Sequence, residues 1–367
     1  MPRMPEPRAL KFEALASDLR RAITAGTWPL GSRLPTEQQF VESTGYSLST
    51  VRRAIDILTE EGVVERRQGS GMYVEGLPRR KRGSLTIGVL IPDTSLYFPR
   101  VLQGIEAGLS ESPASLTLAT YGYDAEVEKT ALQKLLDSGV DGLLITPLVS
   151  ETAKPDSFLE RLEAIPVPTV LVERRLHALD HFDPTEFVCS NHEGGVLRAV
   201  THLHSMGHRR IALCTRIESA PAGAIRRGYD EAPRYLDALE TLVISKSSQE
   251  WVRSHADGVL TELLAAGVTA TVVFGDREAT LLEIACQRRG IRVPEDLAIV
   301  SYDDELADVA PVPLTAVAPA KHRVGRMAAN LLLARIAEGD QSPVQQISII
   351  PRLVVRESCG AAKQSDD

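Results

Sequence analysis

This chain of 367 residues is poor in the features that mark secreted, membrane-spanning or zinc-binding proteins. It has 4 cysteines (Cys189, Cys214, Cys286 and Cys359), and no two of them form a Cys-x-x-Cys pair. Neither a zinc ribbon nor a disulfide framework is therefore indicated, and we expect reduced thiols. No apolar run approaches the roughly 18 residues that span a bilayer, and the N-terminus lacks the apolar core of a signal peptide. We therefore expect a protein of the cytoplasm.

The chain also lacks the common motifs of nucleotide-binding and hydrolytic enzymes. It contains no Walker-type motif, no Gly-x-Ser-x-Gly and no Gly-x-Gly-x-x-Gly after a strand-like run. His202, His204 and His208 lie close together in the sequence, but no convergent cysteine or carboxylate set accompanies them. We therefore expect no metal and no cofactor.

Negative charge exceeds positive charge overall, yet the two are unevenly placed. The net charge is −8 in a chain whose length suits two or three domains. Residues 1–84 carry 14 Lys and Arg against 10 Asp and Glu, a net charge of +4. The remainder carries 27 against 39, a net charge of −12. This distribution indicates a basic head that meets phosphates and an acidic body that does not.

Three helices are predicted in the head, residues 1–75. In the first, apolar residues recur at intervals of three and four and form one helix face: Phe12, Leu15, Ala16, Leu19 and Ile23. Gly26 and Pro29 end this helix. Thr36 is a candidate N-cap for a short second helix, which Gly45 closes.

The third helix has two different faces. Ser47 can cap it, and its buried stripe is Val51, Ala54, Ile55 and Leu58. At about 100° per residue, Ser49 and Arg53 point away from this stripe, and Arg52 lies on its flank. Such a helix can pack on one side and enter a major groove with the other.

A short β-hairpin is predicted after the third helix. Residues 62–67 alternate like a strand, residues 68–71 are of the types that form turns, and residues 72–74 are predicted to form the second strand of the hairpin. A basic hairpin in this position is a wing whose small tip can approach a phosphate or the minor groove closely.

The ordered series resembles the winged helix–turn–helix of GntR-type regulators from Phe12 to Val74. The matching segments are Gly26, residues 30–37 (LGSRLPTE), residues 49–52 (STVR), Leu58, residues 61–62 (EG) and residues 67–71 (RQGSG). The resemblance implies that Arg52, neighbouring hydroxyls and the wing turn contact DNA. The predicted DNA-binding residues are Thr36, Gln38, Ser47, Leu48, Ser49, Thr50, Arg52, Arg53, Gln68, Gly69, Ser70 and Gly71.

Two positions depart from that family. Gln38 and Leu48 stand where many members have arginine. Leu48 cannot bond a guanine edge, although it can touch a thymine methyl group. The operator sequence therefore cannot be copied from relatives.

Residues 76–84 are predicted to be an exposed linker. They have no periodicity, carry four successive cations at 79–82 and are bounded by glycines. The segment either adds nonspecific phosphate contacts or is a solvated tether without a role in DNA binding.

The body, residues 85–367, alternates apolar strand-like runs with segments of helix length. The runs are 85–91, 116–120, 142–145, 169–172, 211–214, 242–244, 271–274 and 297–300. Nearly continuous apolar strands divided by helices indicate parallel sheets that are covered on both faces. The number of runs predicts an α/β fold with two subdomains.

Polar side chains follow several of these runs, where α/β folds bind ligands. They include Asp93, Ser95, Tyr97 and Phe98 after the first run, Glu173, Arg174 and Arg175 after 169–172, Asp276 after 271–274, and Tyr302, Asp303 and Asp304 after 297–300. Aromatic rings that cover a sugar ring, with carboxylates and an arginine that bond its hydroxyls, favour a sugar ligand.

From about Leu85 to Val355 the body resembles the effector domains of LacI/GalR-type regulators, which are similar to type I periplasmic sugar-binding proteins. Matching segments include IGV at 87–89, GVDG at 139–142, IPVP at 165–168, GHRRIA at 207–212, GIRVPEDL at 290–297, YDD at 302–304 and PLT at 313–315. By that resemblance Arg174, Asp276 and Asp303 face the ligand, and Tyr97 and Phe98 stack on it.

Three departures leave the identity of the ligand open. Ile225 stands where the family has the arginine of its Arg-x-x-Gly motif, and Arg226 or Arg227 is a candidate substitute. The usual Asn-Asp pair is Gly275-Asp276, and a polar ligand residue is replaced near Pro319.

A DNA-binding head on such a body resembles the arabinose-repressor type of transcriptional regulator. The resemblance implies a homodimeric repressor, associated with the bacterial nucleoid, that a small effector releases from operator DNA, with a pentose or related sugar as the first candidate. A corepressed regulator or an activator is the first alternative. A sugar-binding transport protein is the second, although the chain carries a DNA-binding head and no signal peptide. The third is a sugar-processing enzyme that uses Glu173, Asp276 and Asp303, but sugar binding alone accounts for these carboxylates.

Overall fold

The computed structural model describes residues 11–24, 27–60, 62–67, 70–75, 84–148, 161–162, 164–175, 185–217, 219, 221–247 and 250–361. The chain divides into two compact units, residues 1–84 and 85–367. The first contains the head and the predicted linker, and the second is the body. Of the predicted linker, only Ser84 belongs to the described residues.

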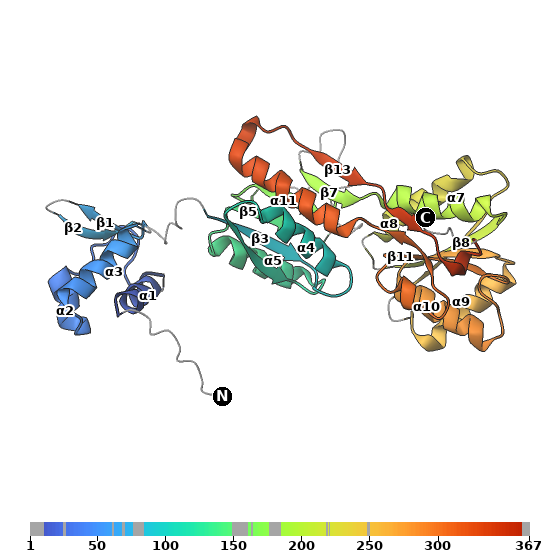
Figure 1. Ribbon diagram of the computed structural model, residues 1–367, viewed down its shortest axis with the longest axis horizontal. Coiled ribbons are helices and arrows are strands. Elements are labelled where there is room, and N and C mark those ends of the chain that lie inside the picture. The colour runs from blue at the N-terminus through green and yellow to red at the C-terminus, as the bar shows by residue number, and fades with distance from the viewer. Residues whose placement is uncertain are drawn as a thin grey trace. The chain divides into compact units, whose positions relative to one another are not determined.

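The head contains the predicted helices and hairpin (Figure 1). Its elements are α1 (Lys11–Thr24), α2 (Glu37–Thr44), α3 (Leu48–Glu60), β1 (Val64–Arg67) and β2 (Gly71–Val74), and the two strands pair antiparallel. Thr36 caps α2 in a capping box with Gln39, and Gly45 ends the helix with φ 72°. Both predicted caps are thus confirmed, because each is a local signal written in adjacent residues.

One apolar cluster holds the head together. The hydroxyl of Ser47 accepts a hydrogen bond from the backbone N–H of Thr50 at 3.3 Å, as expected of a cap. The whole predicted stripe of α3 is buried: Val51, Ala54, Ile55 and Leu58. It packs against Leu15, Ala16, Leu19 and Ile23 of α1 and against Phe40 of α2. The opposite side of α3 stays open to solvent.

The first lobe of the body is a parallel sheet of strand order β13-β7-β6-β5-β3-β4. Its strands are β3 (Leu85–Ile91), β4 (Ala114–Thr120), β5 (Gly142–Ile145), β6 (Thr169–Val172), β7 (Phe187–Ser190) and β13 (Gln346–Ile349). Its helices are α4 (Phe98–Leu109), α5 (Ala125–Asp137) and α11 (Lys321–Glu338).

The second lobe has the strand order β14-β12-β11-β10-β8-β9, parallel except for the edge strand β14. Its strands are β8 (Arg210–Arg216), β9 (Glu240–Lys246), β10 (Ala270–Val273), β11 (Ala298–Tyr302), β12 (Thr315–Ala318) and β14 (Arg352–Val354). Its α-helices are α7 (His192–Ser205), α8 (Ala222–Glu231), α9 (Arg253–Ala265) and α10 (Asp276–Arg288). Single turns of 3-10 helix lie at Ala232–Arg234, Ala307–Val309, Gly339–Gln341 and Glu357–Cys359.

Every strand predicted in the body is present, and β7, β12, β13 and β14 are additional to the prediction. Strands β13 and β14 are only partly buried and so lack a continuous apolar run. Strands β7 (FVCS) and β12 (TAVA) are buried, but β7 contains only two large apolar side chains and β12 only one. The α/β class with two subdomains is confirmed.

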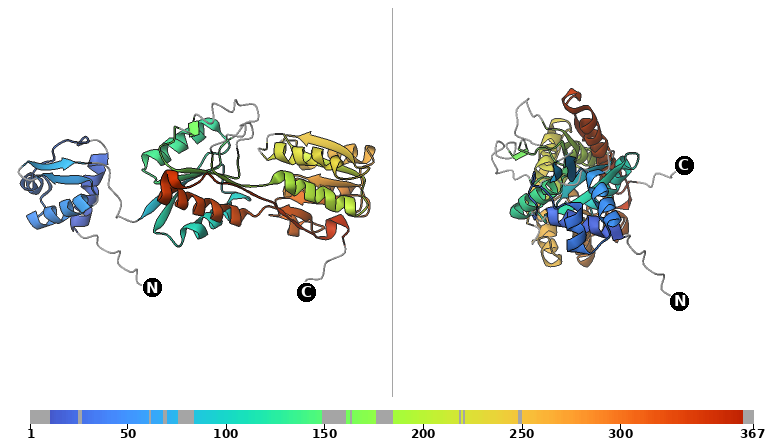
Figure 2. Two further views of the ribbon diagram at one scale, coloured as in Figure 1. Left: turned by 90° about the horizontal axis from the view of Figure 1, so that it is seen from above. Right: turned by 90° about the vertical axis from the view of Figure 1, so that its left-hand side faces the viewer.

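Alternate residues of each strand face different helices, as the twofold period of a strand requires. In β3, Val89 packs towards α4 and α11, whereas its neighbour Leu90 packs towards α5. In β8, Ala212 packs towards α9 and α10, whereas Leu213 packs towards α7 and α8. Figure 2 shows the resulting layers of helix, sheet and helix in the body.

The described chain passes between the lobes at three points. It leaves β7 for α7 near Asn191, leaves β12 for α11 near Pro319, and leaves β13 for β14 near Pro351. Each lobe is consequently built from separated stretches of sequence.

Helices α4 and α11 approach one another with backbone against backbone. A Cβ atom added at Gly325 would lie 2.0 Å from the carbonyl oxygen of Val101, and one at Gly104 would lie 2.0 Å from that of His322. Only glycine permits this approach. Because α11 begins at the second crossing, this contact also sets where that crossing lies.

We therefore expect Gly325→Ala to destabilise the protein by about 1–3 kcal/mol, the usual range for overpacking a close contact. The matched control is Gly258→Ala in α9, where no atom lies within 4 Å of the added Cβ. It should instead stabilise the protein by about 0.5–1 kcal/mol, because alanine is the better helix former. Urea unfolding of both variants measures the difference, and a Gly325→Ala protein as stable as the parent would contradict the analysis.

Candidate functional site

The candidate nucleic-acid interface of the head is organised by one carboxylate. Glu37, the first residue of α2, accepts a hydrogen bond from the Arg52 guanidinium of α3 at 2.7 Å. It accepts another from Arg66 of β1 at 3.3 Å, and Arg66 also pairs with Asp56 at 2.6 Å. Helix α3 and the wing therefore share one face on which two arginines are pre-positioned. Arg66 was not among the predicted DNA-binding residues, although its place in a basic hairpin was a usable signal.

The predicted hydroxyls of α3 lie together. The Ser47 hydroxyl is 3.0 Å from that of Ser49 and 2.8 Å from that of Thr50. Gln38 and Leu48 are exposed, whereas the Thr36 side chain is used as the cap of α2. Ser47, Leu48, Ser49 and Thr50 thus lie at the start of α3, whereas Thr36 and Gln38 lie at the start of α2.

Arg53 has a different environment from Arg52. Its guanidinium lies over the ring of Phe12 in α1, 4.1 Å from the ring centre. Arg53 therefore ties α3 to α1 by a cation–π contact, while Arg52 is directed towards α2 and the wing.

The tip of the wing is compact where the structure describes it. The Ser70 hydroxyl is 2.8 Å from that of Tyr73, and Gly71 adopts φ 114°, which glycine tolerates best. Gln68 and Gly69, also predicted to bind DNA, lie outside the described residues.

A cleft of about 550 Å³ opens in the body where strands of both lobes end. It is lined by Asp93, Ser95, Leu96, Tyr97, Phe98, Tyr123, Leu148, Glu173, Arg174, His192, Arg216, Ser219, Pro221, Phe274 and Asp303. Its volume is in the range that holds a small molecule, and it mixes aromatic with polar side chains as such sites do.

Six of the nine predicted ligand residues line this cleft: Asp93, Ser95, Tyr97, Phe98, Arg174 and Asp303. The structure does not bring Asp276, Arg226 or Arg227 into the lining. It adds others that the sequence did not single out, among them Tyr123, His192, Arg216 and Phe274. Arg216 ends β8, so the rule of carboxyl strand ends, applied to this run too, would have found it.

Glu173 anchors one wall of the cleft. Its Oε1 atom accepts hydrogen bonds from the Tyr97 hydroxyl at 2.7 Å and the Ser190 hydroxyl at 3.0 Å. Its Oε2 atom accepts from the Ser190 backbone N–H at 2.9 Å. Burial, with help from Glu173, raises the pKa of Tyr97 well above its ordinary value. Tyr97 is therefore held as a neutral donor, and its ring is presented to the cleft.

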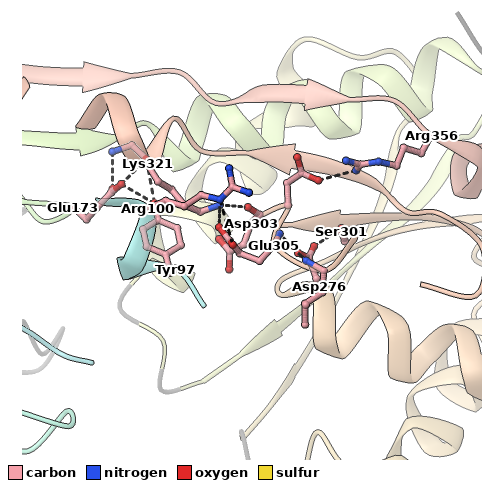
Figure 3. A network of polar contacts seen from close by, with 12 residues as sticks. Tyr97, Arg100, Glu173, Asp276, Ser301, Asp303, Glu305, Lys321 and Arg356 are labelled. Atoms are coloured by element: carbon pink, nitrogen blue, oxygen red, sulfur yellow. Dashed lines mark hydrogen bonds and ion pairs between the residues drawn. The ribbon is translucent and has the colours of Figure 1, made fainter. Parts of the chain in front are cut away.

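Asp276 does not line the cleft, and it holds the loop that carries Asp303 (Figure 3). Its carboxylate accepts hydrogen bonds from the Ser301 hydroxyl at 2.6 Å, the Glu305 N–H at 2.5 Å and the Leu306 N–H at 2.9 Å. Asp303 adopts φ 95° in this loop, a conformation that costs energy and needs such support. Asp276 is thus a positioning residue in this structure.

Asp303 contributes a third carboxyl group to the cleft, besides Asp93 and Glu173. Burial raises its pKa to about 7, the Lys321 ammonium opposes the rise, and Asp276 adds to it. Lys321, at the start of α11, donates a hydrogen bond to the Asp303 carbonyl oxygen and pairs with Glu305 at 2.5 Å (Figure 3).

The head and the body each match a known family. Residues 11–74 match the model of bacterial regulatory proteins of the gntR family, and residues 200–359 match that of the periplasmic binding protein-like domain. An arabinose metabolism transcriptional repressor of Geobacillus stearothermophilus is 29% identical over 97% of this chain and 99% of its own. The HTH-type transcriptional repressor PurR of Haemophilus influenzae is 30% identical over 89% of this chain and 98% of its own. Among solved structures, a transcription regulator named GntR from Chromobacterium violaceum is 27% identical with a TM-score of 0.62, covering 75% of this chain and 100% of that one.

The chain belongs to the family of bacterial helix–turn–helix transcriptional regulators with a LacI-type, periplasmic-binding-protein-like domain. The regulator carries the gntR variety of head, as its sequence predicted. Among the helices that the structure describes, none is long and apolar enough to cross a membrane.

The two arginines proposed to replace the missing family arginine lie on the surface of α8. Arg226 pairs with Asp230 at 2.6 Å, and Arg227 pairs with Glu193 at 3.0 Å. Ile225 is buried in the core of the second lobe. Helix geometry explains the result, since residues one and two positions after a buried residue point to other sides of the helix.

The three neighbouring histidines each have a separate partner. His202 lies 3.3 Å from the Cys359 sulfur, His204 lies 2.8 Å from the Asp237 carbonyl oxygen, and His208 lies 2.9 Å from the Thr269 hydroxyl. Within the part of the chain that the structure describes, no group of three or more metal-binding side chains gathers.

The raised pKa of Asp303 predicts that the regulator without ligand is stabilised by Asp303→Asn at high pH. The pKa lies above the value in an unfolded chain, so ionisation in the fold is unfavourable and destabilises it as the pH rises towards 7. The gain in melting temperature should be largest above pH 7, at about 2–4 °C for each kcal/mol recovered. It should shrink as the pH falls and vanish below about pH 4, where the Asp303 carboxyl group is protonated in both the folded and the unfolded chain. A pH-independent gain measured by differential scanning fluorimetry would show that ionisation is not its cause.

Proposed function

We propose that this regulator is a repressor that binds operator DNA through the head and leaves it when a small, sugar-like effector fills the cleft of the body. The observation that carries this proposal is the cleft itself, lined from both lobes by aromatic rings and hydrogen-bonding side chains. Two relatives that span nearly the whole chain are named as repressors, one of them of arabinose metabolism.

The head has the features that DNA reading needs. Arg52 and Arg66 are exposed on one face and are held by Glu37, so little side-chain freedom is lost when they meet DNA. We propose that Arg52 and neighbouring side chains contact bases while the wing contacts the backbone. Two heads of a homodimer would then occupy half-sites about one or more helical turns apart.

Ion pairs between the lobes offer a way for the effector to act. Arg175 of the first lobe pairs with Glu193 of α7 at 3.0 Å, and Arg100 of α4 lies 3.7 Å from Glu305. An effector that contacts both walls of the cleft would shift the balance between arrangements of the lobes. Thermodynamic linkage then requires that the DNA-bound regulator binds an inducer less tightly than the free regulator does.

The proposal also states the direction of control: the effector weakens operator binding. A corepressor would instead strengthen it, and measuring operator affinity at increasing effector concentration distinguishes induction from corepression. We also propose that the regulator acts on DNA in the cytoplasm and that it binds its effector without transforming it. The contacts of Glu173 support binding without chemistry, because its carboxylate oxygens accept hydrogen bonds from Tyr97 and Ser190 and are poorly placed to act as an acid or base.

Arg52→Ala should weaken specific operator binding by about 1–3 kcal/mol. The matched control is Arg53→Ala on the same helix, which removes an equal charge but loses its contact with Phe12 instead. We expect Arg53→Ala to lower the stability of the head and to reduce specific operator binding much less than Arg52→Ala does. Fluorescence anisotropy with operator and scrambled duplexes measures both, and equal effects of the two substitutions would refute the assignment of Arg52.

Asp303→Ala should abolish the effector response and spare operator binding without effector. Asp304→Ala is the matched control, because Asp304 also has a positive φ, 54°, yet its carboxylate pairs with Arg356 at 2.7 Å and does not line the cleft. Operator release on adding effector is the measurement. A response that survives Asp303→Ala would mean that the effector binds elsewhere.

A further inference from the structure

The carboxylates of the cleft are largely satisfied by the protein itself. Both oxygens of Glu173 are hydrogen-bonded, as described above. The Asp93 Oδ1 atom accepts hydrogen bonds from the backbone N–H and the hydroxyl of Ser95, both at 2.7 Å. Asp303 has its pKa raised to about 7 by burial, so its charge is incomplete at neutral pH.

The guanidinium groups of the cleft, by contrast, have nitrogen atoms without hydrogen-bond partners among the described residues. Arg174 donates through Nη1 to the Glu173 carbonyl oxygen at 2.7 Å, but its Nε is buried and has no hydrogen-bond partner among the described residues. The Nε of Arg216 is likewise buried and unpartnered within the described chain. The nearest carboxylate oxygen paired with Arg216, on Glu278, is 3.9 Å away, beyond hydrogen-bond distance.

These two arginines come from different lobes and line the same cleft. Arg174 follows β6 of the first lobe, and Arg216 is the last residue of β8 in the second. Burial raises the pKa of Tyr123, Asp93 adds to the rise, and both guanidinium groups oppose it. Arg174, Arg216 and Tyr123 all line this cleft. The Phe274 ring, whose centre is 5.0 Å from the Arg216 guanidinium, supports that side chain from one face.

Buried donors without partners are costly, and an anionic oxygen is the acceptor that a guanidinium binds best. We infer that the effector carries an anionic group, a carboxylate or a phosphate, which Arg174 and Arg216 bind from opposite lobes. The inference rests on the proposed function and narrows its effector class to sugar acids and sugar phosphates. An anion held between the lobes would also draw them together, which links its charge to the conformational response.

The test compares three matched pairs of probes on the full-length protein: L-arabinose with L-arabonate, D-glucose with D-glucuronate, and D-ribose with D-ribose 5-phosphate. Isothermal titration calorimetry gives the affinity of each compound. The two carboxylates test whether the effector is a sugar acid, and D-ribose 5-phosphate tests whether it is a sugar phosphate. We expect at least one charged member to bind about 10-fold or more tightly than its neutral parent, as loss of a hydrogen bond to a charged group implies.

Arg216→Gln should weaken binding of that charged probe by about 10- to 100-fold and change binding of its neutral parent by less than about 3-fold. The control is Arg226→Gln, whose guanidinium pairs with Asp230 outside the cleft lining and should leave both affinities unchanged. Melting curves of both variants confirm that each is folded.

Two results would overturn the inference and leave the proposed function standing. One is operator release by a neutral sugar while no charged probe binds. The other is an equal loss of neutral and charged binding in Arg216→Gln. Intact operator binding with release by no compound of either kind would instead overturn the proposed function.

Discussion

Both lobes of the body direct the carboxyl ends of their parallel strands at one shared cleft, and the other features of the ligand site depend on this constraint. The cleft residues follow the carboxyl ends of β3 to β8, β10 and β11 or, like Arg216, end a strand. The arrangement requires the chain to pass between lobes repeatedly, and the passage into α11 is held by the glycine contact with α4. A side chain larger than hydrogen at Gly325 would displace a crossing and, with it, one wall of the site.

The walls of the cleft are kept in costly conformations by buried polar networks. Glu173 and Asp303 both have positive φ values, 55° and 95°, which are uncommon for residues other than glycine. Hydrogen bonds from Ser190 and Tyr97 hold Glu173 in place, and hydrogen bonds of Asp276 and Lys321 hold the loop of Asp303. The protein thus spends its own donors on the acidic groups and leaves guanidinium donors open, so the cleft is better prepared to receive an acceptor than a donor.

The head follows the same principle on a smaller scale. Glu37 holds an arginine of α3 and an arginine of the wing, which makes one surface of two separate elements. These pairs are exposed and individually weak in water. They orient the guanidinium groups of Arg52 and Arg66 on that surface.

The sequence by itself determined the elements of the head, the helix caps at Thr36 and Gly45, the α/β class of the body and the family of both units, since periodicity, caps and motifs are written in adjacent residues. Only the tertiary structure decided which polar side chains reach the cleft. Asp276, at a strand end, turns back to bond its neighbouring loop, whereas Arg216, at another strand end, faces the ligand space. The direction of a side chain at a strand end depends on partners that are distant in the chain, so local pattern could indicate the strand ends that border the cleft but not which side chains line it.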